Sequence, residues 1–336
     1  MAVEIVLPTE LARRDADGPR EGLVVGVDAG GTKTLAAALD LASGVVTTGR
    51  AGPANPDAIP MQDALAAMVE AVREATGDRD DTRGVVIAGA GTDAGTIGAA
   101  VAGVLPAALF VNDVVAAWAT VAGGKPGIAV ISGTGSNSLG VDAQHRARRV
   151  GGWGHVFGDE GSGHWLGAEM VGAAIRAFDG RAPATALGDL LARELGVPDA
   201  GAAVMRLYAE GAGKTAVAAL APLVSRAADD GDPVATALLR TAGEDLAAHV
   251  QAIADALDLD AGGSLPVGLT GSTWKAGGAL VDGFRAGVAR RLPNAQIQRI
   301  ETPPVIGSLA LALHACGRSD AVDTLLSDAA EQLRDA

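Results

Sequence analysis

Two stretches of the chain begin in the same way, and this repetition limits the folds that the chain can adopt. Each starts with a short apolar run typical of a buried strand, passes through a turn rich in glycine and threonine, and resumes as a second strand. The first covers residues 23–41 and the second covers residues 127–141. Strands alternate with helices after both openings. We therefore predict an α/β protein in two halves on one plan, each with a mixed sheet flanked by helices.

The length suits two domains of ordinary size, because 336 residues are many for a single hydrophobic core. We expect an N-terminal domain over residues 23–120 and a C-terminal domain over residues 121–315, with a helical insertion at about 164–257. Residues 316–336 are expected to form a C-terminal helix that packs back on the N-terminal domain. Residues 1–22 are polar and charged, which predicts a disordered tail, no secretion signal and a cytoplasmic protein.

The composition argues against several kinds of partner and site. The formal net charge of −14 disfavours nucleic acid and an anionic membrane surface, because binding to phosphate-rich surfaces needs a basic face. A nucleotide can still bind through backbone N–H groups and helix N-termini. Cys316 is the only cysteine, so the chain can form neither an internal disulfide nor a multi-thiolate metal site.

The stretch from Gly151 to Gly163 carries the most functional information, since six of its thirteen residues are glycine. Glycine lets a backbone approach a ligand in conformations that other residues avoid. Trp153 and the adjacent carboxylates of Asp159 and Glu160 lie among these glycines. An aromatic plane and two carboxylates on such a backbone are typical of a pocket for a polar, ring-shaped small molecule.

The glycine- and threonine-rich turns indicate a grip on phosphate groups. In the first turn, residues 28–34, the glycines let the backbone wrap a phosphate and the threonine and lysine side chains can donate hydrogen bonds. Asp28, at the strand end, could hold Mg²⁺ through water. The alternative is an ordinary hairpin, because Gly-Gly is a common turn pair. The second turn, residues 133–137, favours the phosphate interpretation because both halves then share it.

Asn112 and Asp113 follow an apolar strand and open a helix. Asn or Asp at this position is most simply a helix N-cap. A carboxylate that projects from a strand end into a cleft is also where a general base is needed. The residues alone leave both interpretations open.

Three other patterns are predicted to have no catalytic role. Residues 211–215 end like a P-loop, but Tyr208 stands where that pattern needs glycine and no strand precedes it, so a helix start is expected. His155 and His164 lack a third clear ligand, which favours a polar lining or structural role over a metal site. Residues 229–232 are expected to form a solvated turn, because the later ligands of a calcium loop are missing.

Taken in order, these motifs resemble the BadF/BadG/BcrA/BcrD ATPase family of the sugar kinase and actin superfamily, and most closely its N-acetylglucosamine kinase branch. The resemblance runs from Leu23 to Ala315. Its elements are a first phosphate loop at 26–34, a helix opening at 112–113, a second phosphate loop at 132–137, a sugar loop at 152–162, an adenosine motif at 271–273 and a second connecting helix at 303–313. The resemblance implies two actin-like, ribonuclease H-like domains with a cleft between them, and a homodimer.

The resemblance also implies a role for each site residue. Asp113 would be the catalytic base, and Asp28 would hold Mg²⁺ through water. The sugar would be bound by Asn55, Asn112, Asp113, Gly152, Trp153, Gly154, Asp159 and Glu160. ATP would be bound by Gly30, Gly31, Thr32, Lys33, Thr34, Gly133, Thr134, Gly135, Ser136, Gly271, Ser272 and Thr273.

The expected activity is ATP-dependent phosphorylation of the C6 hydroxyl of an amino sugar, N-acetylglucosamine or glucosamine. A kinase for N-acetylmuramic acid or another hexose is the second hypothesis, and an ATPase that couples hydrolysis to a partner protein is the third. The iron–sulfur activators of the family hold a cluster on cysteines, which a single cysteine fits poorly. Ala29 stands where many relatives have a third glycine, a small change that leaves the loop plausible.

Overall fold

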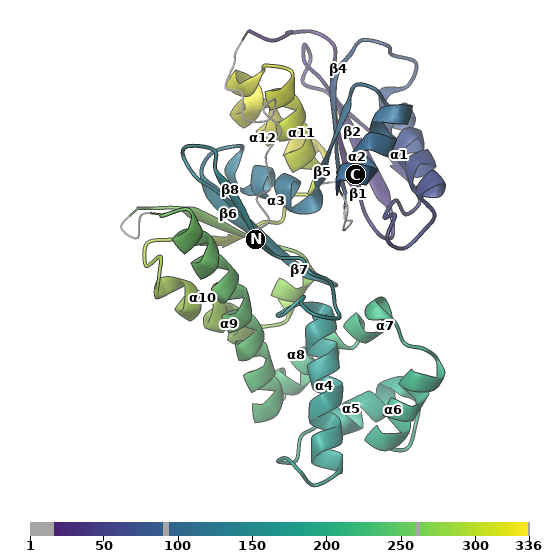
Figure 1. Ribbon diagram of the computed structural model, residues 1–336, viewed down its shortest axis with the longest axis vertical. Coiled ribbons are helices and arrows are strands. Elements are labelled where there is room, and N and C mark those ends of the chain that lie inside the picture. The colour runs from purple at the N-terminus through teal and green to yellow at the C-terminus, as the bar shows by residue number, and fades with distance from the viewer. Residues whose placement is uncertain (1–16, 90–93, 260–262, 335–336) are drawn as a thin grey trace. The chain divides into compact units, whose positions relative to one another are not determined.

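The computed structural model describes residues 17–89, 94–259 and 263–334, and the chain divides into two compact units (Figure 1). Unit 1 comprises Met1–Ile128, Val141–Ala147 and Ile300–Ala336. Unit 2 comprises Ala129–Gly140 and Arg148–Arg299. The chain therefore leaves unit 1 for unit 2 and returns to unit 1 for its last part.

Unit 1 is built on a five-stranded sheet with the spatial order β3-β2-β1-β4-β5. Its strands are β1 (Leu23–Ala29), β2 (Thr34–Asp40), β3 (Val46–Ala51), β4 (Thr82–Gly89) and β5 (Ala108–Asn112). The strands β1, β2 and β3 pair antiparallel, whereas β4 pairs parallel with both β1 and β5. The apolar run of β1 is buried on both faces, as expected for a central strand with helices on either side.

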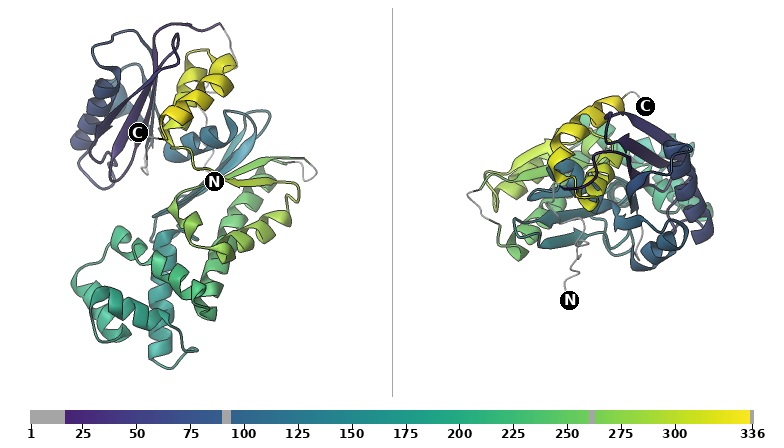
Figure 2. Two further views of the ribbon diagram at one scale, coloured as in Figure 1. Left: turned by 180° about the vertical axis from the view of Figure 1, so that it is seen from behind. Right: turned by 90° about the horizontal axis from the view of Figure 1, so that it is seen from above.

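Helices cover both faces of this sheet. They are α1 (Met61–Thr76), α2 (Ala94–Val104), α3 (Asp113–Ala122), α11 (Val305–Ala315) and α12 (Val322–Gln332), with a 3₁₀ turn η3 (Ser319–Ala321) before the last. Buried residues of α1 form one core with Leu23, Val25 and Val27, which point to the same face of β1. Helix α11 packs on the opposite face, as Figure 1 and the left view of Figure 2 show.

The helix α11 lies very close to both β1 and α3. The hydroxyl of Ser308 donates a 2.9 Å hydrogen bond to the carbonyl oxygen of Val27 in β1. On the other side, a Cβ atom on Gly307 would overlap the carbonyl oxygen of Ala116 in α3. Only glycine allows this approach, so Gly307 fixes the spacing of the two helices.

Unit 2 contains a second five-stranded sheet, with the order β10-β9-β6-β7-β8. Its strands are β6 (Gly127–Ser132), β7 (Ser136–Val141), β8 (Ala147–Gly151), β9 (Pro266–Thr270) and β10 (Gln296–Arg299). Its helices are α4 (Gly163–Phe178), α5 (Leu187–Leu195), α6 (Ala200–Ala209), α7 (Lys214–Ala218), α8 (Ala221–Asp229), α9 (Pro233–Ala256) and α10 (Gly278–Ala289), with a 3₁₀ turn η2 (Ser272–Lys275). The long helix α9 packs against α10, which buries the apolar faces of both (Figure 1).

The two sheets repeat one plan. Read from β8, the second sheet runs β8-β7-β6-β9-β10, so its third strand in chain order lies at one edge and its first strand lies at the centre, as in unit 1. Two mixed sheets flanked by helices confirm the fold class predicted from the repeated opening. The predicted helical segment is also present, because α4 to α9 occupy most of residues 163–256.

The division of the chain differs from the predicted boundaries. Residues 300–315 were expected in the C-terminal domain but belong to unit 1, because α11 packs on β1 and α3. The segment 316–336 also belongs to unit 1, where the Gln332 side chain donates a 3.0 Å hydrogen bond to the carbonyl oxygen of Gly44. The helices α11 and α12, which are distant from β1 in sequence, therefore belong to the same unit as β1.

The predicted disordered tail, residues 1–22, lies outside the described residues as far as position 16. The described part is held by hydrogen bonds, which corrects the prediction for this part. Gly18 donates its backbone N–H to the carbonyl oxygen of Gly317 at 3.0 Å, and Arg318 donates to the carbonyl oxygen of Pro19 at 3.1 Å.

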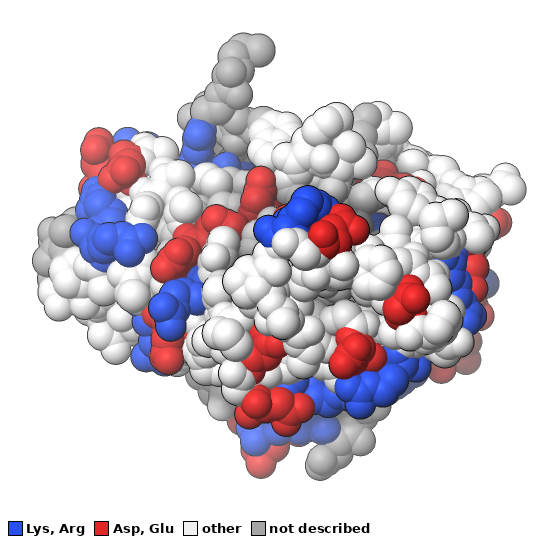
Figure 3. Space-filling model, turned by 90° about the horizontal axis from the view of Figure 1, so that it is seen from below, with Lys and Arg blue, Asp and Glu red and all other residues white. Residues whose placement is uncertain are grey.

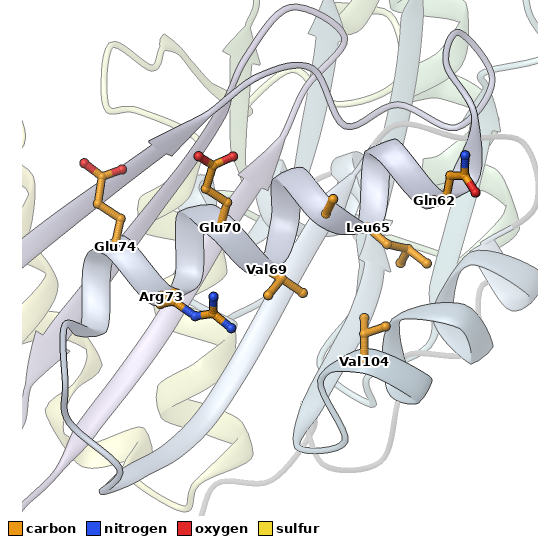
Figure 4. Close-up of a pocket in the computed structure, with 8 residues that line it drawn as sticks. Gln62, Leu65, Val69, Glu70, Arg73, Glu74 and Val104 are labelled. Carbon is orange, nitrogen blue, oxygen red and sulfur yellow. The ribbon is translucent and has the colours of Figure 1, made fainter.

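A surface hollow lies between α1 and α2 in unit 1 (Figure 4). Its lining residues are Gln62, Leu65, Ala66, Val69, Glu70, Arg73, Glu74 and Val104. None of the predicted site residues is among them, so we assign this hollow no role in catalysis.

Two observations concern the nucleic-acid and membrane partners that the net charge disfavours. Among the described residues, no helix combines the length and the apolar character that crossing a membrane requires. On the face drawn in Figure 3, acidic and basic side chains are interspersed, without a broad basic patch.

Candidate functional site

The predicted site residues of unit 1 share one edge of its sheet. The strand register joins a row of residues across all five strands: Ala51, Thr34, Ala29, Gly89 and Asn112. Four of these, Ala51, Ala29, Gly89 and Asn112, end strands that run in the same direction. The described segments that follow Ala51, Ala29 and Asn112 therefore leave the sheet at the same edge. Adjacent strands lie about 4.8 Å apart, which puts Asn112 about 10 Å from the end of β1. Ligands of α/β proteins bind at this kind of edge.

Within the first phosphate loop, residues 30–33 form a tight connection between β1 and β2. Gly30 donates its N–H to the carbonyl oxygen of Lys33 at 3.0 Å, which closes the turn. Gly31, Thr32 and Lys33 are exposed, as phosphate-binding groups must be. Thr34 differs from the prediction, because its buried hydroxyl donates a 2.8 Å hydrogen bond to the carbonyl oxygen of Gly52. This side chain stabilises the neighbouring loop, and its one hydroxyl proton is not available to a phosphate.

Asn55 lies in a loop that is tied to the first phosphate loop. Ala54 donates its N–H to the carbonyl oxygen of Gly30 at 2.9 Å. The Asn55 side-chain oxygen accepts a 2.9 Å hydrogen bond from the N–H of Asp57, which orients the amide. The segment that carries Asn55 is thereby fixed at the same sheet edge as residues 30–33.

Asp28 lies within β1, next to the loop. Burial raises the pKa of this carboxyl above its ordinary value, and the nearby positive charge of Lys33 opposes the rise. A partly buried carboxylate with an unfavourable charge is stabilised by any cation that approaches it.

Asn112 and Asp113 occupy the end of β5 and the first turn of α3. The Asn112 side-chain oxygen accepts a 3.2 Å hydrogen bond from the N–H of Val114 and so caps the helix. Asn112 is thus the N-cap of α3. Asp113 follows the cap and supplies a half-buried carboxylate in the first turn of α3.

Within the second phosphate loop, residues 133–135 connect β6 with β7 in unit 2. The N–H of Gly133 donates to the carbonyl oxygen of Gly135 at 2.9 Å, and the carbonyl oxygen of Gly133 accepts a 2.8 Å hydrogen bond from the N–H of Gly163. Gly163 begins α4, so the loop lies against the first turn of that helix. Ser136 differs from the prediction, because its hydroxyl is buried and donates to the carbonyl oxygen of Glu160 at 2.8 Å.

The sugar loop, residues 152–162, runs beside the second phosphate loop. Three hydrogen bonds to backbone carbonyls join the two segments: Ser136 Oγ to the Glu160 carbonyl, Ser132 Oγ to the Gly161 carbonyl, and the Gly152 N–H to the Ser136 carbonyl. A fourth runs from the Ser136 N–H to the Asp159 carboxylate. Backbone φ is positive at several loop glycines, as the sequence predicted. Trp153 is 63 % exposed, and the guanidinium of Arg149 lies 5.8 Å from the centre of its ring. The indole ring of Trp153 therefore lies exposed on the surface of unit 2.

Asp159 has a different environment from the rest of the sugar loop. Its side chain is 3 % exposed and its φ is +62°, which is uncommon for a residue with a side chain. One carboxylate oxygen accepts a 3.2 Å hydrogen bond from the N–H of Ser136. The other lies 2.7 Å from Nζ of Lys214. In this structure Asp159 joins the sugar loop to the second phosphate loop and to α7.

The predicted adenosine motif, residues 271–273, lies against the end of β6, next to the second phosphate loop. Gly271 has a φ of +102°, and a Cβ atom there would overlap the carbonyl oxygen of Ser132 at the end of β6. The Trp274 indole N–H donates a 3.3 Å hydrogen bond to the carbonyl oxygen of Val130, which holds η2 against β6. The motif is thereby fixed beside residues 133–135.

A hollow of about 420 Å³ lies between the second phosphate loop, η2, α7 and α8. The predicted residues Gly133, Thr134, Ser272 and Thr273 line one side of it. Sequence analysis missed the opposite side, which consists mainly of small residues: Thr215, Ala218, Ala219, Ala221, Pro222 and Ser225. The only sequence signal was the run of small residues after position 214, which is hard to distinguish from an ordinary helix.

The patterns that were given no catalytic role have structural explanations. A helix begins at Lys214 as predicted, and α6 precedes it where a P-loop needs a strand. The rings of His155 and His164 meet edge to face, with centroids 4.9 Å apart. Among the described residues, no group of three or more His, Cys, Asp or Glu side chains is arranged to hold a metal ion. Asp232 caps α9 by accepting the N–H groups of Val234 and Ala235.

Residues 25–314 match the sequence pattern of the BadF/BadG/BcrA/BcrD ATPase family. The chain belongs to this family. The match covers both phosphate loops, the sugar loop and the adenosine motif, and it confirms the resemblance on which the predicted roles rest.

The chain is similar to two named sugar kinases and to one solved structure. The chain is 29% identical over 310 residues to the N-acetylmuramic acid/N-acetylglucosamine kinase of Clostridium acetobutylicum, and this match covers 87% of the chain and 99% of the relative. It is 30% identical over 209 residues to the N-acetyl-D-glucosamine kinase of Dictyostelium discoideum, which covers 61% of the chain and 65% of that protein. A solved structure from Chromobacterium violaceum, of a candidate N-acetylglucosamine kinase, aligns with a TM-score of 0.69 at 29% identity over 88% of this chain and 100% of that one.

Proposed function

We propose that the protein transfers the γ-phosphoryl group of ATP to the C6 hydroxyl of an amino sugar, N-acetylglucosamine or glucosamine. The observation that carries this proposal is the common sheet edge in unit 1, which gathers the first phosphate loop, Asn55 and Asp113. Membership of an ATPase family and similarity to sugar kinases support it.

Asp113 would act as the general base. Its place in the first turn of α3 favours the ionised carboxylate, because the helix dipole is positive at that end. The carboxylate would take the proton of the C6 hydroxyl as that oxygen attacks the γ-phosphorus. A general base typically contributes about 10²- to 10⁴-fold to the rate.

The sugar would be held by polar groups and one aromatic face. In unit 1, the amide of Asn55 has two N–H donors that its turn hydrogen bond does not use. In unit 2, the exposed ring of Trp153 can stack on the apolar face of a sugar, while the backbone at Gly152 and Gly154 approaches the hydroxyl groups. The carboxylate of Asp159 would take part only after an exchange of partners, because it is buried against Lys214.

The nucleotide would lie against the hollow in unit 2. A volume of about 420 Å³ is in the range of pockets that hold small ligands. The nucleoside would occupy this hollow, with its phosphates along residues 133–135. In unit 1, residues 31–33 have the exposed groups that phosphate binding needs. Phosphoryl transfer needs mainly positioning and charge neutralisation, which backbone N–H groups supply.

The residues present fit Mg²⁺ bound chiefly by phosphate and water. Asp28 offers carboxylate oxygens whose charge is disfavoured by burial, and a divalent cation relieves that cost. Bound Mg²⁺ supplies neutralisation of the negative charge that develops on the transferred phosphoryl group. The homodimer implied by the resemblance belongs to this proposal and is tested by the mass of the protein in solution.

The test is ADP release from Mg·ATP with a panel of sugars: N-acetylglucosamine, glucosamine, N-acetylmuramic acid, N-acetylmannosamine and glucose. It is run on the wild type, on Asp113→Asn and on Asp63→Asn, a matched control in the first turn of α1 with an exposed carboxylate. We expect turnover with N-acetylglucosamine or glucosamine, a loss of about 10²- to 10⁴-fold in Asp113→Asn, and no loss in the control. Phosphate analysis of the product by NMR identifies the C6 position.

The relative from Clostridium favours a second candidate, because its name includes N-acetylmuramic acid. Turnover of that sugar with a higher kcat/KM than N-acetylglucosamine would favour this candidate. ATP hydrolysis at a rate that no sugar changes and that Asp113→Asn leaves unaltered would overturn both candidate substrates. It would support an ATPase that acts with a partner protein.

A further inference from the structure

Lys214, which the sequence pattern gave no role, lies at the junction of three elements of unit 2. Its Nζ is 2.7 Å from the Oδ2 atom of Asp159 in the sugar loop. A Cβ atom on Gly135 of the second phosphate loop would lie 2.9 Å from the same Nζ. The ammonium group therefore rests directly on the backbone of that loop, where any larger residue than glycine would displace it.

The ion pair that Lys214 forms is asymmetric. The Asp159 side chain is 3 % exposed, whereas that of Lys214 is 34 % exposed, so the ammonium group faces solvent on one side. The contact lacks hydrogen-bond geometry, and Asp159 Oδ2 has no hydrogen-bond partner among the described residues. An ammonium has three N–H donors, so it can meet a carboxylate and a second anion together.

The same helix lines the nucleotide hollow. Thr215 and Ala218 of α7, with Ala219 directly after it, form one wall of it, and Gly133 and Thr134 of the second phosphate loop form another. Lys214 begins α7, so it lies where the hollow meets the loop. A nucleoside in the hollow with its phosphates along residues 133–135 brings those phosphates to the ammonium group.

The net charge of the protein makes such a cation valuable. The protein has a formal net charge of −14, so a polyanion approaches against a negative background. Asp159 holds the ammonium group in place before the ligand arrives, which reduces the entropy that the long lysine side chain loses on binding. This arrangement holds the buried Asp159 in a strained backbone conformation, which is typical of functional sites.

We propose that Lys214 is a phosphate-binding residue of the nucleotide site, held by Asp159 in the empty protein and shared with the terminal phosphates of ATP in the complex. The shift toward the phosphates frees Asp159 Oδ2 to accept a hydrogen bond from a sugar hydroxyl. This inference rests on the proposed use of ATP and not on the identity of the sugar.

The test measures nucleotide binding without sugar, by isothermal titration calorimetry at fixed salt. The ligands are adenosine, ADP and the non-hydrolysable analogue AMPPNP, and the variants are Lys214→Gln and Lys214→Arg. The matched control is Lys125→Gln, which breaks another Lys–Asp pair of 2.7 Å, with Asp323, on the surface of unit 1. We expect Lys214→Gln to lose about 10- to 100-fold in affinity for AMPPNP, as for a charge-assisted contact, and to bind adenosine within about twofold of the wild type.

The other variants separate charge from structure. Lys214→Arg should retain most of the AMPPNP affinity, and Lys125→Gln should retain all of it. Because Lys214→Gln leaves a buried carboxylate without its counter-charge, the double variant Asp159→Asn/Lys214→Gln is measured beside it and should show the same loss for AMPPNP.

Three outcomes would overturn the inference. Equal losses for adenosine and AMPPNP would show that Lys214 only supports the fold of the hollow. Unchanged AMPPNP binding by Lys214→Gln would remove Lys214 from the site while leaving the proposed kinase intact. A wild-type protein that binds no AMPPNP would overturn the proposed use of ATP, and this inference with it.

Discussion

The hydroxyl of Thr273 donates a 3.0 Å hydrogen bond to the carbonyl oxygen of Gly133, although 140 residues separate them in the chain. The same carbonyl oxygen accepts the N–H of Gly163 at the start of α4. One atom of the second phosphate loop thus joins η2 to α4. The walls of the nucleotide hollow are held together at this point.

Replacement of Thr273 by valine should therefore weaken nucleotide binding. Valine keeps the shape of the side chain and removes the donor, which costs about 1 kcal/mol of stability and loosens η2 against the loop. We expect the KM for ATP to rise about tenfold, with the KM for the sugar unchanged. Thr273→Ser keeps the hydroxyl and serves as the control. Equal ATP kinetics in the valine variant and the wild type would contradict this role of the bond.

Asn55 offers a substitution that separates its two functions. Asn55→Asp keeps the oxygen that accepts the N–H of Asp57 and removes the amide donors. We expect the loop to keep its conformation and the KM for the amino sugar to rise at least about tenfold, because polar sugar groups lose a donor. The KM for ATP should not change. Steady-state kinetics with each substrate varied in turn provide the measurement, and a rise in the ATP KM alone would contradict the proposed sugar contact.

Gly307 should tolerate no side chain. Gly307→Ala places a methyl group on the carbonyl oxygen of Ala116, so α11 and α3 must separate. We expect a loss of about 1–3 kcal/mol in the free energy of unfolding, as for overpacked cores. Gly103→Ala, in α2, is the control, because a Cβ there meets nothing within 4 Å and alanine favours the helix. Urea denaturation compares the two, and similar midpoints would show that the helices can shift at no cost.

The buried His249 should make the free energy of unfolding depend on pH. Burial lowers its pKa from the ordinary 6.5, against the opposing charges of Glu160 and Asp159, and its ring contacts the Ser138 hydroxyl at 3.1 Å. Between the lowered folded pKa and 6.5 the unfolded chain binds more protons than the folded one. Stability from this residue is therefore complete above pH 6.5 and declines as the pH falls below it, by at most about 1.4 kcal/mol per pH unit.

The measurement is denaturant unfolding at several pH values for the wild type and His249→Gln. Glutamine does not titrate, so the variant should show a smaller decline in the free energy of unfolding below pH 6.5. Identical slopes in the two proteins would mean that other groups cause the acid sensitivity.

Features encoded by neighbouring residues could be predicted from the sequence. The apolar strands, the turns after them and the cap at Asn112 all depend on contacts within a few residues, and each is present in the structure. The order of the motifs was enough to predict the fold class. These features are local because strand periodicity and helix capping are local.

Features that depend on distant contacts could not be predicted. The hydroxyls of Thr34 and Ser136 suited phosphate binding by type, but their partners Gly52 and Glu160 come from other segments. Lys214 was set aside because the P-loop pattern around it failed, and nothing near it in sequence points to Asp159. The placement of α11 on the first sheet likewise depends on packing that no local pattern encodes.

The return of the chain to unit 1 has a consequence for its synthesis. The face of β1 that α11 covers stays without its partner until residues 305–315 have been translated, whereas unit 2 is complete at residue 299. Domains generally fold as their residues emerge from the ribosome. Unit 1 is therefore the first unit to be translated and the last to be completed. A chain released before residue 300 lacks α11, so one face of the β1 sheet remains uncovered.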